Sequence, residues 1–290
     1  MTAVPRPLPS RTALWARRVL ADRRAVLGLT LLGALVLLAF AGPALSRWEW
    51  TDTDFTAIRE PPSAEHWFGT TDSGRDVYAL TLRGMRRSLL IGFCAAALTT
   101  ALAALVGITA GYAGGWIDRT LMWGTDLLLV VPAFLVVAML SPALGATWPL
   151  LVAVLAAVMW TITARMVRHM TISLKRREFV LAARYMGVGP VRTVLRHILP
   201  HLASLLIIDG TLNVGVAIVA ESALAYFGFG VRPPDVSLGT LIADGSGAVT
   251  AFPWLFGFAA ALLVLTVLAV NLVGEGLRDA LDPAAGGGAR

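Results

Sequence analysis

The stretch EFVLAARYMGVGPVRTVLRHILP, residues 178–200, is a polar and basic segment between two long apolar stretches. It contains the small residues Ala182, Ala183 and Gly187, followed by Gly189-Pro190. Because proline fits the first turn of a helix but not its interior, this pair predicts the end of one short helix and the start of another. Small side chains allow another protein to approach the helix backbone closely. The stretch therefore predicts a docking loop, and an amphipathic helix at the lipid headgroups is the alternative.

The composition of the whole chain is that of a membrane protein. Only 14% of the 290 residues are charged, 57% are hydrophobic, and the mean hydropathy is +0.74. Soluble domains have about one quarter charged residues. The net charge of +6 does not indicate nucleic-acid binding, because the basic residues lie beside apolar spans and are not interleaved with aromatic residues. The single cysteine, Cys94, lies in an apolar run and is expected to pack there.

The apolar segments predict an all-α polytopic fold with six transmembrane helices. A spanning helix needs about 20 mostly apolar residues. The long stretch 120–164 exceeds one helix, and Ser141-Pro142 with Pro149 is expected to divide it. The arginine-rich start resembles a signal peptide, but its apolar run is longer than a signal core and is interpreted as a retained helix. The expected spans are 25–45, 88–112, 121–140, 148–165, 204–227 and 253–274.

The arginine and lysine distribution predicts the orientation. With six spans, 17 of the 24 basic residues fall on one side, which is the cytoplasmic side by the positive-inside rule. Both termini are then cytoplasmic, and the regions expected there are the tail 1–24, the loop 165–203 and the tail 276–290. The loop 46–87 is extracytoplasmic despite Arg86 and Arg87, and the helical core covers 88–275.

The sequence lacks the common catalytic motifs. It has no Gly-Lys-Ser/Thr phosphate loop, no HExxH and no CxxC, and its four histidines form no ligand-like cluster in a span. His197 and His201 are four residues apart, but Pro200 is expected to break a helix between them. We therefore expect no enzyme activity, no metal site and no cofactor bound by this chain. Energy for active transport would come from another subunit.

The pattern of residues 181–200 is similar to the signature of ABC-importer permeases. That signature is Glu-Ala-Ala, three residues, Gly, nine residues and Ile-x-Leu-Pro. Here Ala182-Ala183 is followed at the same spacing by Gly187 and by His197-Ile198-Leu199-Pro200. Leu181 stands where the family usually has glutamate, and Glu178, one turn earlier, could substitute for it.

Three further segments extend the resemblance over most of residues 22–283. They are HWFGTTDSGRDV at 66–77, ESALAYFGFG at 221–230 with Pro233-Pro234, and NLVGEGLRDALDP at 271–283. Together they resemble the second, C-type permease subunit of oligopeptide/dipeptide ABC importers. The resemblance implies the type I permease fold with a cytoplasmic coupling helix, in the bacterial inner (plasma) membrane.

The resemblance also implies partners and a substrate class. The partners would be a homologous second permease, two P-loop ATPase subunits or one fused ATPase that bind ATP and Mg²⁺, and an extracytoplasmic peptide-binding protein, with no nucleic acid. The substrate would be an oligopeptide or dipeptide. A permease for another small solute such as nickel or glutathione is an alternative. A self-contained secondary transporter would need an ion relay or an internal repeat, which the sequence does not show.

Three sets of residues are candidate sites. The residues expected to couple to the ATPase are Glu178, Ala182, Ala183, Arg184, Gly187 and Pro200. The acids expected in or near spans, and therefore candidates for the pathway, are Asp126, Asp209 and Glu221. The residues expected to contact the binding protein are Trp67, Asp72, Arg75 and Asp76. For Asp126 and Asp209 a hydrogen-bonded structural role is the alternative.

Overall fold

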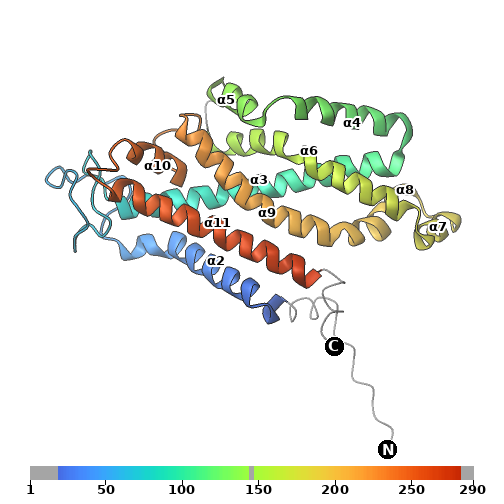
Figure 1. Ribbon diagram of the computed structural model, residues 1–290, viewed down its shortest axis with the longest axis horizontal. Helices are drawn as coiled ribbons and strands as arrows, with labels where there is room; N and C mark the ends of the chain where they lie inside the picture. The colour runs from blue at the N-terminus through green and yellow to red at the C-terminus, as the bar shows by residue number, and fades with distance from the viewer. Residues whose placement is uncertain (1–18, 144–146, 282–290) are drawn as a thin grey trace, which may run out of the picture.

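The computed structural model describes residues 19–143 and 147–281, and the ordered elements in these ranges are helices (Figure 1). Along the chain they are α2 (Arg23–Ala41), η1 (Gly42–Leu45), α3 (Val77–Ala113), α4 (Gly115–Val130), α5 (Ala133–Ala143), α6 (Trp148–Lys175), α7 (Glu178–Tyr185), α8 (Pro190–Thr193), the π-helical turn η2 (Val194–Ile198), α9 (Leu199–Tyr226), α10 (Leu238–Ser246) and α11 (Trp254–Leu281). The all-α fold class is thereby confirmed. Of the expected tails 1–24 and 276–290, residues 1–18 and 282–290 lie outside the described residues.

Five of the described helices are long and apolar enough to cross a membrane without a break. They are Arg23–Leu45, Val77–Ala113, Trp148–Lys175, Pro190–Tyr226 and Trp254–Ala280. The sixth candidate is a bent pair, in which Gly115–Val130 and Ala133–Leu140 meet at 81°. The count of six expected from the sequence therefore holds if this pair is one span.

The stretch 120–164 is divided as expected, with α5 ending at Ala143 and α6 beginning at Trp148, but an additional bend lies at Val131-Pro132. Pro132 has no backbone N–H to donate to the preceding turn, and it disfavours helical backbone in the residue before it. Val131 is extended, with φ −87° and ψ 126°. By contrast, α5 continues through Pro142 to Ala143. The expected span 121–140 thus corresponds to the bent pair, and its break at Val131-Pro132 was not expected.

A second proline has less effect than expected. Pro200 does not end a helix between His197 and His201; the π-helical turn Val194–Ile198 leads directly into α9. The wider i→i+5 spacing of such a turn accommodates a residue that cannot make the normal helical bond. His201 Nδ1 lies 2.7 Å from the His197 carbonyl oxygen.

The helix α3 is the longest element and packs along α6. Two glycines of α3 make this approach close: a Cβ on Gly107 would lie 2.5 Å from the Ala164 carbonyl oxygen, and one on Gly111 would lie 2.8 Å from the Arg168 carbonyl oxygen. Small residues at this spacing allow two helices to cross closely. Gly115, four residues further on, makes no such contact, because its Cβ would meet nothing within 4 Å.

The ends of the bundle carry different structures (Figure 1). The helices α7 and α8 lie at one end, and the segment 46–76 and α10 lie at the other, with α2 and α11 side by side between them. The expected loop 165–203 includes the end of α6 and the start of α9. We call residues 176–200 the coupling loop and residues 46–76 the outer segment. The helix α3 starts at Val77 rather than near 88, because Asp76 accepts a hydrogen bond from the Ala79 N–H and caps it.

We expect Gly107→Ala to destabilise the helical bundle, because its methyl group must displace the backbone of α6. Overpacking of this kind typically costs about 1–3 kcal/mol. The thermal midpoint of the detergent-solubilised protein should fall. Gly33→Ala in α2 is the matched control, since its Cβ would meet nothing within 4 Å. Equal midpoints for the two variants would contradict the close α3–α6 contact.

Candidate coupling loop and outer segment

The coupling loop turns sharply after α7. Gly187 has φ +80°, a left-handed conformation that other residues adopt only with strain. Its N–H donates to the Arg184 carbonyl, and the Val188 N–H donates to the Ala183 carbonyl. These bonds satisfy carbonyl groups at the end of α7, as glycine-terminated helices commonly do. Pro190 then starts α8, so the expected break at Gly189-Pro190 is confirmed.

One side of the coupling loop packs against the membrane helices. Val180 and Ile198 are fully buried in a small apolar cluster. The cluster also contains Ile108 of α3, Val167 of α6 and Leu202 of α9. The loop is therefore attached by side-chain packing to three long helices, and a force applied to it would reach all three.

The other side of the coupling loop exposes apolar side chains. Tyr185 is 88% exposed and Met186 77%, and Val191, Leu195 and Phe179 are also exposed. Exposed apolar residues that gather on a charged loop indicate a surface that another protein covers. The sequence reasoning, which concentrated on small residues, missed these five, although apolar residues in a basic loop were a visible signal.

The six expected coupling residues lie on both sides of the loop. Ala183 is only 2% exposed and, with Val180, forms the buried part of α7. The other five, which are Glu178, Ala182, Arg184, Gly187 and Pro200, are exposed. Of the Ala-Ala pair, therefore, Ala182 is accessible to a partner and Ala183 is buried.

Two of the three acids expected near the pathway have polar partners on neighbouring helices or turns. Asp126 of α4 pairs with Arg165 of α6, next to a second α4–α6 pair in which Arg168 Nη2 lies 2.6 Å from Asp118 Oδ2. Asp209 accepts hydrogen bonds of 2.8 Å from Thr163 and Asn213. These contacts fit the structural alternative, and contact with a solute stays a prediction for both acids.

Glu221 is completely buried where α9 meets α10. Its carboxyl group lies near the hydroxyls of Ser88 and Ser237, but neither oxygen has a hydrogen-bond partner of normal geometry among the described residues. The junction is tight, because a Cβ on Gly239 would lie 2.5 Å from the Ser222 Cα. A role in the pathway stays a prediction for Glu221 as well.

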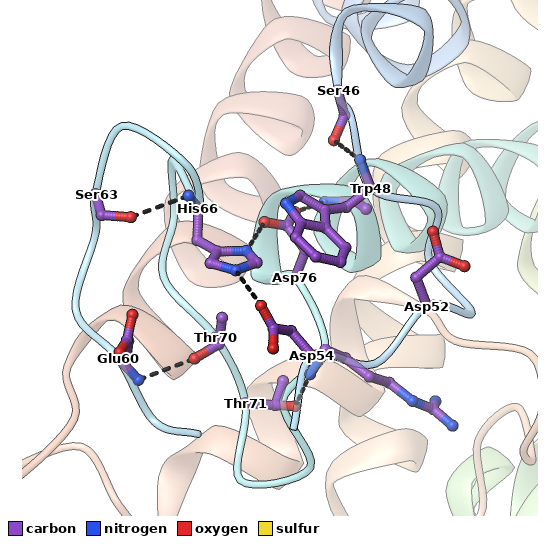
Figure 2. Close-up of polar contacts among 12 residues, drawn as sticks. Ser46, Trp48, Asp52, Asp54, Glu60, Ser63, His66, Thr70, Thr71 and Asp76 are labelled. Carbon is purple, nitrogen blue, oxygen red and sulfur yellow. Dashed lines mark hydrogen bonds and ion pairs between the residues drawn. The ribbon is translucent and has the colours of Figure 1, made fainter. Parts of the chain in front are cut away.

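The outer segment is organised around His66, which is only 1% exposed (Figure 2). Its Nδ1 lies 2.9 Å from Asp76 Oδ2, its Nε2 lies 3.8 Å from Asp54 Oδ2, and its ring stacks on Trp48. Two hydrogen bonds from Thr56, from its hydroxyl and from its N–H, hold the pKa of Asp54 below its usual value. The segment thus has a polar centre tied to the first turn of α3.

The four expected contacts to a binding protein differ in accessibility. Asp72 is exposed, Trp67 is 47% exposed and packs edge-on against Tyr78, and Arg75 is half-buried. Asp76 is only 3% exposed, because it caps α3 and faces His66. Asp76 therefore shapes the outer segment from inside and presents no surface to a partner.

Asp235 forms ion pairs with two arginines near the outer end of α3 and so offsets part of their positive charge. Arg87 Nη2 lies 2.6 Å from both Asp235 oxygens and Arg83 Nη2 lies 3.0 Å from one. Burial raises the pKa of Asp235, but the hydrogen bonds from the two arginines outweigh this, so the pKa lies below its usual value. Arg83 and Arg87 also stack on Trp50 and Trp148. These contacts let α3 include residues that were expected in a loop.

Comparisons with known proteins agree with this architecture. Residues 103–286 match the model of the family described as binding-protein-dependent transport system inner membrane component. Residues 10–62 match the N-terminal TM domain of oligopeptide transport permease C.

Full-length relatives give the same result. The chain is 53% identical over 277 residues to the oligopeptide transport system permease protein OppC of Mycobacterium tuberculosis, covering 95% of each chain. It is 36% identical over 274 residues to the protein of the same name from Bacillus subtilis, covering 93% of this chain and 90% of the relative. The chain belongs to the family of binding-protein-dependent transport system inner membrane components, and it is a multi-pass permease subunit.

Proposed function

We propose that this chain is one of two homologous permease subunits in an ATP-driven importer of oligopeptides or dipeptides. The observation that carries the proposal is the coupling loop, which packs on three long helices on one side and exposes apolar residues on the other. The names of the relatives from M. tuberculosis and B. subtilis support peptide as the substrate class.

In this proposal the ATP chemistry belongs to other subunits. Two P-loop ATPase subunits, or one fused ATPase, bind ATP and Mg²⁺ and dock on the exposed side of the coupling loop at the cytoplasmic face. When they close and reopen, they move the loop. Because Val180 and Ile198 pack against α3, α6 and α9, this movement tilts those helices and opens the pathway alternately to the two sides.

The outer segment is proposed as the contact for an extracytoplasmic peptide-binding protein. It lies at the end of the bundle opposite α7 (Figure 1), and its exposed Trp67 and Asp72 are free to meet a partner's surface. Its buried His66–Asp76 contact holds the segment in one shape, so less ordering is needed when the partner binds.

The direct test is purification of the chain from membranes in mild detergent, with mass spectrometry of the retained proteins. We expect a second permease, P-loop ATPase subunits and, with a bound peptide, a binding protein. Recovery of the chain alone or only with copies of itself would contradict the proposal and would favour a self-contained transporter.

Gly187→Val should reduce ATP-driven peptide uptake at least about tenfold while the chain still inserts into the membrane. A β-branched residue at φ +80° is a strong outlier, so the turn after α7 must rearrange. Gly189→Val is the matched control, because Gly189 has φ −61° and a Cβ at either glycine would meet nothing within 4 Å. Normal uptake by the Gly187 variant would refute the role of this turn in docking.

Asp76→Ala should loosen the outer segment, because it removes the helix cap of α3 and the partner of His66. Loss of a cap alone typically costs about 1 kcal/mol. We expect faster protease cleavage within residues 46–76 and weaker stimulation by the binding protein, with ATPase subunits still retained on purification. Glu65→Ala, an exposed acid in the same segment, should behave like the wild type. Unchanged cleavage in Asp76→Ala would show that the contact is dispensable.

A further inference from the structure

A pocket of about 440 Å³ lies at the outer end of the bundle, and nothing described so far explains it. It is bounded by residues 59–75 of the outer segment, the first turns of α3, and α10. Its volume is within the range of small-molecule sites, roughly 300–1,000 Å³. Four charged side chains line it: Arg59, Asp72, Arg75 and Asp244. The pocket is therefore of ligand size and carries both signs of charge.

The four charged side chains of the pocket do not form ion pairs with one another. Within residues 19–143 and 147–281, none of the four forms an ion pair. The guanidinium of Arg59 lies over the Phe252 ring, 5.1 Å from its centre. Three of them, Arg59, Asp72 and Asp244, are exposed, and Arg75 is half-buried. Both signs are thus held around the pocket and remain available to a ligand.

Two buried polar atoms at the pocket also lack a partner. Thr81 of α3 lines the pocket, is 0% exposed, and its Oγ1 makes no hydrogen bond among the described residues. The Nε of Arg75 is buried and likewise without a hydrogen-bond partner. A buried donor that finds no acceptor destabilises the fold, so such groups call for an explanation. A bound ligand with acceptor oxygens would provide the missing hydrogen-bond partners.

The two carboxylates favour a cationic group between them. Asp72 comes from the outer segment and Asp244 from α10. Burial raises the pKa of Asp244, and the negative charge of Asp72 raises it further. Since the two carboxylates repel each other, a cation placed near both would be attracted by both.

We propose that this pocket binds the free ends of a short peptide, with the ammonium group at Asp72 and Asp244 and the carboxylate at Arg59 and Arg75. Thr81 then donates to a peptide oxygen. The inference rests on the peptide-import function proposed above and assigns the permease itself a first site for a peptide that leaves the binding protein. A free peptide carries one charge of each sign at its ends, which matches the lining.

The test uses the complete importer complex in lipid nanodiscs without binding protein, and tri-alanine as the probe. Saturation-transfer NMR reports which peptide contacts the complex. N-acetyl-tri-alanine amide has the same side chains without charged ends. The variants are Asp244→Asn and Thr81→Val, and Glu65→Gln is the control, because it removes one negative charge from the outer segment outside this pocket.

We expect transfer to tri-alanine but not to the blocked peptide, and binding weakened about fivefold or more by each pocket variant, as loss of one hydrogen bond implies. Glu65→Gln should bind like the wild type. Thr81→Val should keep or raise the melting temperature, since a partnerless hydroxyl is removed without loss of volume. If Thr81→Val loses peptide binding but keeps its melting temperature, Thr81 contacts the ligand and does not act only through the stability of the fold.

The following results would overturn the inference. Equal transfer to both peptides, or unchanged binding in both variants, would show that the pocket does not recognise peptide ends. If Asp244→Asn left tri-alanine binding intact but weakened association of the binding protein, the pocket would be part of a protein–protein contact. If the wild-type importer with its binding protein took up no peptide, the proposed function would fail as well. If peptide uptake were normal but the pocket variants bound tri-alanine like the wild type, only the pocket proposal would be refuted.

Discussion

The close packing of α3 on α6 is the contact on which the other arrangements depend. At Gly107 and Gly111 the backbones approach so closely that a single methyl group would overlap carbonyl oxygens of α6. In lipid, helices gain little from burying apolar surface against each other, so close backbone contact supplies much of the attraction. This contact fixes two long helices side by side, and their ends position the outer segment and the coupling loop.

The two ends of the bundle are built alike: at each end, one face packs against the helices and the other face is exposed. In the coupling loop, Val180 and Ala183 are buried while Tyr185 and Met186 are exposed. In the outer segment, His66 and Asp76 are buried while Asp72 remains accessible. The inner faces make each end a rigid extension of the helices, so the binding of a partner at one end is felt by the whole bundle.

The sequence was informative where a residue type has few alternatives. Apolar runs located the spans, and Gly189-Pro190 located the turn of the coupling loop. The sequence was less informative where a tertiary contact determines the local structure or the burial of a residue. Nothing local distinguishes Pro132, which bends its span, from Pro142, which remains inside a helix. Similarly, Ala182 and Ala183 are adjacent residues of the same type, and only the folded structure buries one of them. The burial of Asp76 depends on His66 in the same way.

The pairing of Arg83 and Arg87 with Asp235 has a consequence for how the protein is made. The partners are 152 and 148 residues apart, so α3 is synthesised long before its counter-ion. In the proposed orientation, the outward end of α3 must cross the membrane against the usual preference for basic residues on the cytoplasmic side. Its neutralisation comes only when the chain after α9 folds back. In that orientation, the charges at the outward end of α3 would be neutralised only after the second half of the chain is synthesised.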